Sequence, residues 1–136
     1  MNIFCSPRFK KEFENLIKKN SYKSLEKDIY LYFLNGSDNL LSGSRLNNSI
    51  DAPFIKKRLN GSGGYRFYFL IIIKNDNLYL SYVHPKTGVY GADNIKDEFK
   101  AEIQKEIYEC IVGNDLYKIT EKGTKLQFKH IKEKVK

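Results

Sequence analysis

Hydrophobic positions with helical spacing predict three helices. Apolar residues three or four positions apart lie on one face of a helix, and the polar residues between them face water. This pattern predicts a first helix after Pro7, a second helix from Ser24 to Asn35-Gly36, and a third helix over residues 95–111 that ends at Gly113. The apolar positions that define these faces are Phe9, Phe13, Leu16, Ile17, Leu25, Ile29, Tyr32, Phe33, Phe99, Ile103, Ile107 and Ile111.

Aromatic and β-branched residues gather in stretches that predict β-strands. Residues 2–6, 54–59, 65–74 and 78–83 have this composition, and a short polar turn at residues 75–77 joins the last two. The predicted order is therefore β-α-α-β-β-β-α. This order indicates the α+β class, with an antiparallel β-sheet, an N-terminal helix hairpin and a C-terminal helix packed on it.

The chain has 136 residues, which is the length of one ordinary domain. We predict a domain over residues 1–113 and a basic C-terminal extension over residues 114–136. Within the extension, residues 125–128 alternate weakly and allow a short strand. Residues 36–53 are rich in Ser, Asn and Gly, which predicts a long loop.

Positive charge is in excess and is unevenly distributed. The chain contains 24 Lys and Arg against 16 Asp and Glu, a formal net charge of +8. Residues 118–136 hold seven Lys and two Glu, a net of +5, which leaves +3 for the rest of the chain. A domain this basic attracts polyanions, among which nucleic acid is the commonest. A solvated lysine-rich surface is the alternative explanation.

Several classes of protein are not expected from this sequence. The longest apolar run, residues 67–73, is far shorter than the roughly 20 residues of a membrane span. The amino terminus does not resemble a signal peptide, so we expect a cytoplasmic protein that does not bind membranes. The cysteines, Cys5 and Cys110, are isolated, and the histidines are only His84 and His130. We therefore expect neither a metal site nor any other cofactor.

One candidate site combines cations from two predicted strands. Alternate residues of a strand share a face, so Lys56 and Arg58 point together while Lys57 points away. Arg66 on the next strand can join them and complete a cluster of three cations. His84, near the end of the following strand, has an ordinary pKa suited to proton transfer. The alternatives are a solvated edge strand for the lysines and arginine of residues 56–58 and an exposed loop position for the histidine.

The ordered set of these segments resembles the RelE/ParE superfamily, the toxins of bacterial type II toxin–antitoxin systems. The resemblance covers most of residues 1–112 and is carried chiefly by Ser62-Gly63-Gly64-Tyr65-Arg66. Its other parts are Phe9-Lys10-Lys11-Glu12-Phe13, Phe54-Ile55-Lys56-Lys57-Arg58-Leu59, Leu78-Tyr79-Leu80, Lys86 and the amphipathic helix from Ile95. The resemblance implies a RelE-like fold for residues 1–113.

The resemblance also implies an activity and assigns residues to it. RelE-type members cleave messenger RNA on the ribosome by attack of the ribose 2′-hydroxyl on the adjacent phosphate, a reaction that requires no metal. Lys56 and Arg58 match paired basic positions of the second strand, and Arg66 matches the arginine of the Gly-Tyr-Arg motif. Lys86 matches a basic residue after the fourth strand, and Tyr90 matches a tyrosine near the carboxyl end of ribonuclease members.

Two other functions fit the same sequence. ParE-type members share the fold but inhibit DNA gyrase, and a non-enzymatic basic module would bind RNA, DNA or an acidic protein. For a toxin, the resemblance implies a cognate antitoxin that is acidic and partly disordered. The other partners implied are RNA on the ribosome, and operator DNA contacted through the antitoxin.

Overall fold

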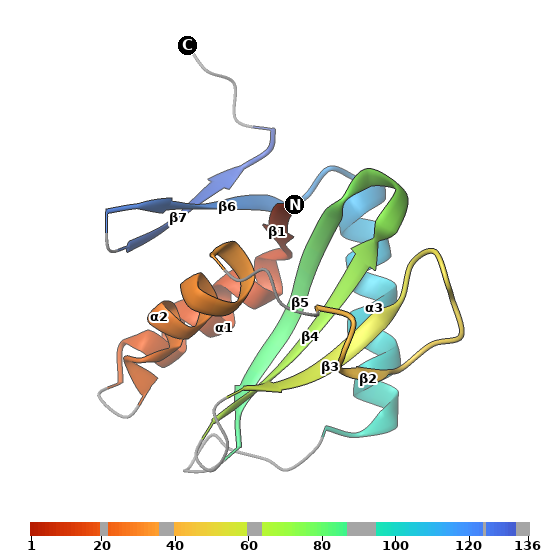
Figure 1. Ribbon diagram of the computed structural model, residues 1–136, viewed down its shortest axis with the longest axis horizontal. Helices are drawn as coiled ribbons and strands as arrows, with labels where there is room; N and C mark the ends of the chain where they lie inside the picture. The colour runs from red at the N-terminus through yellow and green to blue at the C-terminus, as the bar shows by residue number, and fades with distance from the viewer. Residues whose placement is uncertain (20–21, 36–39, 60–63, 87–94, 124, 133–136) are drawn as a thin grey trace.

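The computed structural model describes residues 1–19, 22–35, 40–59, 64–86, 95–123 and 125–132 (Figure 1). Seven strands and three α-helices make up this part of the chain. In chain order they are β1 (Asn2–Cys5), α1 (Pro7–Ile17), α2 (Leu25–Ile29), β2 (Ser44–Arg45), β3 (Phe54–Leu59), β4 (Tyr65–Ile72), β5 (Asn77–Pro85), α3 (Asp97–Val112), β6 (Tyr117–Lys122) and β7 (Lys125–His130). None of the described helices is long and apolar enough to cross a membrane.

The strands form one mixed sheet in the order β2-β3-β4-β5-β1-β6-β7. The first strand, β1, runs parallel to β5, from Asn2 opposite Asn77 to Cys5 opposite Leu80. Every other neighbouring pair in the sheet is antiparallel. The predicted antiparallel β-α-α-β-β-β-α sheet is therefore wrong. The sheet is mixed, and it gains β2, β6 and β7 from segments predicted as a loop and an extension.

The predicted helix hairpin also differs from the structure, because its second helix is only partly α-helical. Ser6 caps α1, because its hydroxyl accepts a hydrogen bond of 3.1 Å from the Phe9 backbone N–H, and Pro7 begins the helix. The second helix is α-helical only over Leu25–Ile29 and continues as a π-helical turn over Tyr30–Leu34. The apolar residues of both segments, including Phe9 and Phe33, pack in the core against one face of the sheet.

The third helix, α3, covers the opposite face of the sheet. Ile103 and Ile107 of α3 are fully buried against Phe54, Leu70 and Tyr79 of the strands. The helix ends at Gly113, as predicted, and Asn114 adopts a left-handed backbone conformation with φ of 54°. Two hydrophobic layers therefore enclose the sheet, one on each face.

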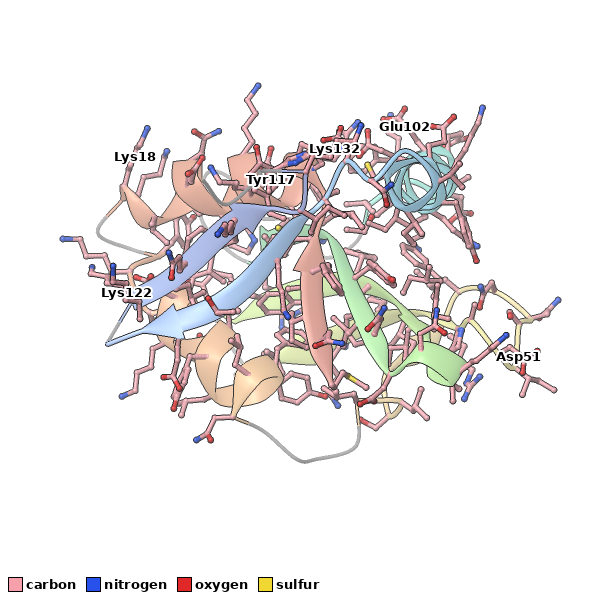
Figure 2. The ribbon with its side chains drawn as sticks, turned by 90° about the horizontal axis from the view of Figure 1, so that it is seen from above. Lys18, Asp51, Glu102, Tyr117, Lys122 and Lys132 are labelled. Carbon is pink, nitrogen blue, oxygen red and sulfur yellow. The ribbon has the colours of Figure 1, made fainter. Side chains whose placement is uncertain are left out.

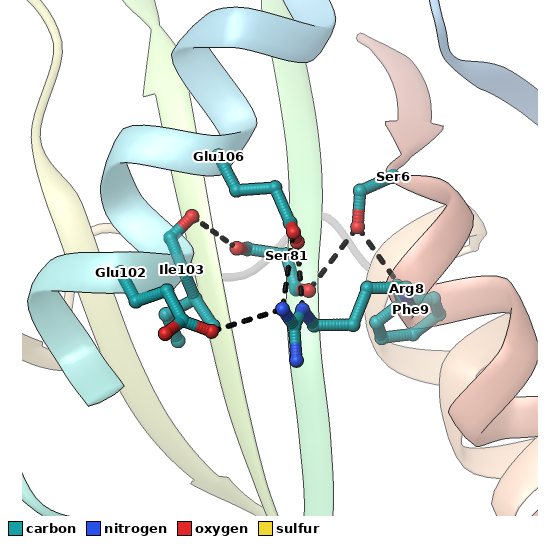
Figure 3. A network of polar contacts seen from close by, with 7 residues as sticks. All are labelled: Ser6, Arg8, Phe9, Ser81, Glu102, Ile103 and Glu106. Carbon is teal, nitrogen blue, oxygen red and sulfur yellow. Dashed lines mark hydrogen bonds and ion pairs between the residues drawn. The ribbon is translucent and has the colours of Figure 1, made fainter.

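A polar network joins α1, β5 and α3 (Figure 3). The Arg8 guanidinium donates hydrogen bonds of 2.7 and 3.1 Å to the Glu106 carboxylate and one of 3.0 Å to Glu102. Ser81 of β5 donates a hydrogen bond of 3.0 Å to the Ile103 carbonyl, and Ser6 donates one of 3.2 Å to the Ser81 carbonyl. These contacts fix the start of α1 and the middle of α3 on the same strand.

The segment after Gly113 continues the sheet. The β6 strand pairs with β1, and β7 pairs antiparallel with β6, so that the two form the β6–β7 hairpin. Ile119 of β6 is buried, and the Phe128 ring of β7 packs on the Phe13 ring of α1 with centroids 5.1 Å apart. The Leu126 backbone N–H donates a hydrogen bond of 2.8 Å to the Glu26 carboxylate of α2. The described residues of this segment, 116–123 and 125–131, are therefore part of the packed protein.

Candidate functional site

Strand pairing brings most of the predicted site residues onto one face of the sheet. Arg58 of β3 lies directly opposite Arg66 of β4, and Arg66 lies opposite His84 of β5. In the neighbouring row, Lys56 lies opposite Tyr68. Directly paired residues share a face, and so do residues two positions apart. We call this group the cationic cluster: Lys56, Arg58, Arg66, Tyr68 and His84.

The cationic cluster is buried except at one side chain. Arg66 is 2% exposed, His84 4% and Lys56 9%, and Tyr68 is fully buried. Arg58 is exposed at the end of the same row. Charged side chains are rarely buried this deeply without a partner of opposite charge. The arrangement presents one exposed guanidinium, that of Arg58, and holds two buried cations, Arg66 and Lys56, behind it.

Arg66 is the residue whose surroundings point most directly to a ligand. Its Nε is buried and has no hydrogen-bond partner among the described residues. No carboxylate in the described part of the chain forms an ion pair with Arg66 or Arg58, although the two arginines are direct neighbours. Like charges in such a position repel each other. An anion bound to both arginines would offset the repulsion between them, and the planar guanidinium group can donate two hydrogen bonds to a phosphate.

His84 and Tyr68 form a hydrogen-bonded pair beside the arginines. The His84 Nδ1 lies 3.1 Å from the Pro85 carbonyl oxygen, and the Nε2 lies 3.1 Å from the Tyr68 hydroxyl. A carbonyl oxygen only accepts, so Nδ1 carries a proton and donates it. In the neutral imidazole, Nε2 therefore accepts the hydrogen bond that the Tyr68 hydroxyl donates.

Burial sets the protonation of this pair. It lowers the pKa of His84, and the nearby cations Arg66 and Lys56 lower it further, against the opposing effect of the bond to Pro85. Burial also raises the pKa of Tyr68 to about 12, although Arg66 and Arg58 oppose the change. At neutral pH both groups are uncharged, and the Nε2 lone pair of the imidazole accepts the hydrogen bond from the protonated phenol.

A groove at the sheet edge reaches the cationic cluster from solvent. It has a volume of about 350 Å³ and is lined by Ser42, Gly43, Ser44, Lys56, Lys57 and Arg58. A Cβ atom at Gly43 would lie 2.4 Å from the Lys56 carbonyl oxygen, so only glycine allows the backbone to approach β3 this closely. The Lys57 ammonium donates a hydrogen bond of 2.7 Å to the Ser42 hydroxyl. The groove is therefore polar, basic and open beside Arg58.

The other predicted site residues are placed less completely. Lys86 directly follows β5, where its backbone N–H donates a hydrogen bond of 2.8 Å to the Gly64 carbonyl at the start of β4. Tyr90 lies outside the described residues.

Tyr68 was not predicted as a site residue, because it stands in an aromatic run typical of a core. Its position two residues after Arg66 was the signal that it shares the arginine's face.

Metal-ligand and thiol chemistry have little support in the described part of the chain. No group of three or more His, Cys, Asp or Glu among these residues is arranged to hold a metal ion. Both cysteines are free and buried, and burial raises the pKa of Cys110 to about 11 and that of Cys5 still further. Buried thiols of this kind are protonated and poor nucleophiles.

Comparisons with known proteins leave the identity of the chain open. No protein-family model matches it, and no curated protein or solved structure matches it either. A functional assignment therefore depends on the residues of the cationic cluster and on the sequence motifs.

Proposed function

We propose that this chain is a metal-independent endoribonuclease that cleaves messenger RNA, as RelE-type toxins do on the ribosome. The observation that carries the proposal is the placement of Arg66. It is buried between Arg58 and His84 with an unpartnered Nε among the described residues. An RNA phosphate supplies the negative charge that this row of side chains needs. The groove beside Arg58 provides the approach for the RNA.

The reaction is a transfer at phosphorus within one RNA strand. The 2′-oxygen of the ribose forms a bond to the adjacent phosphorus while the bond to the 5′-oxygen of the next nucleotide breaks. Negative charge develops on the non-bridging oxygens in the transition state. Arg58, Arg66 and Lys56 stabilise this charge, and preorganised donors of this kind contribute on the order of 10²–10³ each in rate. The cations therefore serve both binding and catalysis.

The Tyr68–His84 pair moves the proton of the attacking hydroxyl. Because Tyr68 is buried in the free protein, this step requires that RNA binding expose its hydroxyl. The Tyr68 oxygen then takes the proton from the 2′-hydroxyl while its own proton passes to His84 Nε2 along their 3.1 Å hydrogen bond. The imidazolium that forms is destabilised by Arg66 and Lys56, so it returns its proton to the Tyr68 oxygen along the same hydrogen bond. The Tyr68 hydroxyl passes a proton to the departing 5′-oxygen, which balances the step.

The proposed activity also implies a neutralising partner. We infer that an acidic, partly disordered antitoxin segment covers the basic groove beside Arg58 and orders on binding. Contact with operator DNA would then run through the antitoxin.

The test compares two exposed arginines at the same sheet edge. Arg58 belongs to the cationic cluster, whereas Arg45 of β2 lies opposite Ile55 and therefore points to the other face. Each variant, Arg58→Ala and Arg45→Ala, removes one exposed guanidinium. Expression from a tightly repressed promoter in bacteria should stop growth and cleave transcripts. Arg58→Ala should reduce cleavage about 10²-fold or more, and Arg45→Ala should leave it unchanged.

A second pair of variants tests the proton transfer. Tyr68→Phe removes the hydroxyl that contacts His84, and we expect cleavage to slow at least about 10²-fold. Tyr82→Phe removes the hydroxyl of a neighbouring tyrosine of β5 and should cleave normally. Circular dichroism checks that each variant is folded. Growth arrest with intact transcripts would contradict the nuclease and favour gyrase as the target. Soluble, folded protein that causes no arrest would favour a non-enzymatic binding module.

A further inference from the structure

The β6–β7 hairpin has one face on which every side chain is polar and exposed. Strand pairing places Lys118 opposite Lys129 and Lys122 opposite Lys125, with a polar pair between them. We call this surface the lysine face: Lys118, Thr120, Lys122, Lys125, Gln127 and Lys129, all of them exposed. The other face of the hairpin, which includes Ile119 and Phe128, packs on the hydrophobic core. The lysine face is therefore the solvent-exposed side of the β6–β7 hairpin, and the opposite side packs on the core.

The lysines of this face repel one another. Two pairs of like charges stand directly opposite across an antiparallel ladder, an arrangement that costs stability. Lys125 has a carboxylate 3.8 Å away, that of Glu26, but its side chain is 78% exposed. The other three lysines of the face form no ion pair with a carboxylate among the described residues. Little within the described chain neutralises this surface.

The surface also has a hollow. A groove of about 390 Å³ runs over it, lined by Lys118, Thr120, Gln127, Lys129, His130 and Ile131. The Thr120 hydroxyl and the Gln127 amide can donate and accept hydrogen bonds beside the Lys118 and Lys129 ammonium groups. The groove thus presents one pair of cations and neutral hydrogen-bonding groups to a ligand, and Ile131 adds an apolar side chain.

We propose that the lysine face binds the sugar–phosphate backbone of RNA and forms a second contact for the RNA that the cationic cluster acts on. The choice of RNA over DNA rests on the proposed ribonuclease function. The preference for nucleic acid over an acidic protein rests on the six strand residues of the face, none of which is apolar or aromatic. His130 and Ile131 enter the lining of the groove from the end of β7 and the residue after it. Protein interfaces depend on buried aromatic anchors and are depleted of lysine, whereas nucleic-acid interfaces are polar and positively charged.

The lysine face lies on the same side of the sheet as the cationic cluster. Lys118 is paired with Phe4 of β1, and the Phe4 ring stacks on the Tyr79 ring of β5 at 5.3 Å. Tyr79 packs beneath α3, which covers the middle of this side. Figure 2 shows Lys122 at the tip of the hairpin, away from Glu102 on α3. The two basic surfaces therefore belong to the side of the sheet that α3 covers, and in the proposal one RNA strand contacts both.

Binding of uncleavable RNA by the full chain tests the proposal without requiring nuclease activity. The probe is a fluorescent 2′-O-methyl oligonucleotide of about 20 nucleotides, longer than the site of a typical single-strand binder. One variant replaces Lys118, Lys122, Lys125 and Lys129 with glutamine. The matched control replaces four other exposed lysines: Lys11, Lys18, Lys23 and Lys105. Each set of four changes lowers the formal net charge from +8 to +4.

We expect the lysine-face variant to bind at least about tenfold more weakly than the wild type, with a shallower dependence of log K on log salt by up to ~3. The control should bind within about threefold of the wild type. Equal weakening in both variants would overturn the proposal, because it would assign binding to net charge alone. Tighter binding of single-stranded DNA, or equal binding of polyglutamate, would overturn the assignment to RNA.

Two further measurements distinguish RNA binding by the lysine face from unfolding of the variant and from the proposed ribonuclease function. Removal of like-charge repulsion should leave the melting temperature of the lysine-face variant unchanged or higher, so lost binding cannot be attributed to unfolding. If the wild type causes no transcript cleavage in cells but only the lysine-face variant loses RNA binding, the ribonuclease proposal is contradicted and RNA binding by the lysine face is supported. If cleavage depends on Arg58 but the lysine-face variant binds RNA normally, the ribonuclease proposal is supported and RNA binding by the lysine face is contradicted.

Discussion

At the scale of single residues, the cationic cluster places a buried cation, Arg66, beside a buried histidine, His84. Arg66 is a buried cation that forms no ion pair with a carboxylate of the described residues, and it lies beside a histidine whose pKa is lowered. If His84 were protonated, a further positive charge would be buried next to Arg66 and Lys56. The lowered pKa of His84 therefore limits the charge within the folded cluster, and it has a measurable effect on stability.

We predict that His84 makes the protein less stable as the pH falls below about 6.5, the ordinary pKa of histidine. The unfolded chain takes up a proton near that pH, whereas the folded chain takes it up only at lower pH. Unfolding is therefore increasingly favoured across this window. Urea unfolding between about pH 8 and pH 5 should show a stability difference between wild type and His84→Gln that shrinks with falling pH. A constant difference would contradict the assigned shift.

The sequence was sufficient to place some cluster residues but not others. The two-residue period of strands put Lys56 and Arg58 on one face, and the register of β3 with β4 brings Arg66 opposite Arg58. Burial is a different property, because it depends on α3 and on neighbouring strands that no local pattern describes. The contact between Tyr68 and His84 depends on the pairing of β4 with β5, which places two distant residues within hydrogen-bond reach.

At the scale of elements, the polar network of Figure 3 holds α1 and α3, which lie on opposite faces of the sheet, in fixed positions relative to β5. Arg8 follows the buried cap of α1 and reaches Glu106 and Glu102 on α3. The Arg8 guanidinium also lies 5.3 Å from the centre of the Phe99 ring. Its hydrogen bonds to Glu106 raise the pKa of Arg8. The side chain therefore links two helices that cover opposite faces of the sheet.

We predict a modest and coupled contribution from this link. Arg8→Met should lower the free energy of unfolding by about 1 kcal/mol, because both partners are partly exposed and screened by solvent. Glu106→Gln should have a similar effect, and the double variant should cost less than the sum of the two. Chemical denaturation of all four proteins gives the coupling energy. Strict additivity would show that the 2.7 Å contact contributes nothing to stability.

The sequence predicted individual elements better than their arrangement. The strands at residues 54–59, 65–72 and 77–85 and the helix at residues 97–112 follow from composition and period. The parallel pairing of β1 with β5 does not, because residues 2–5 contain no local information about which distant strand they join. The alternation in β6 and β7 is weak because lysines occupy the solvent face, so a paired hairpin resembled a basic tail.

At the scale of the whole molecule, the hairpin and the rest of the sheet share one hydrophobic core. Ile119 and Phe128 pack with residues of α1, α2, β4 and β5. Glu26 of α2 accepts a hydrogen bond from the backbone of β7, which ties the hairpin to the helices as well. The chain should therefore unfold in one step rather than as a stable domain with a loosely attached extension.

We predict that Ile119→Ala lowers the free energy of unfolding of the entire protein by about 2–4 kcal/mol, since Ile119 is 2% exposed and its loss leaves a cavity. The control, Thr120→Ala, lies on the exposed side of the same strand and should change stability by less than about 0.5 kcal/mol. Helical circular dichroism and tyrosine fluorescence should follow a single shared transition in both variants. If residues 1–113 were an independent domain, Ile119→Ala would leave the main transition in place, and a chain ending at Gly113 would keep its melting temperature. A common core predicts instead that this shorter chain fails to fold, because Cys5 loses its pairing with β6 and Phe13 loses its contact with Phe128 of β7.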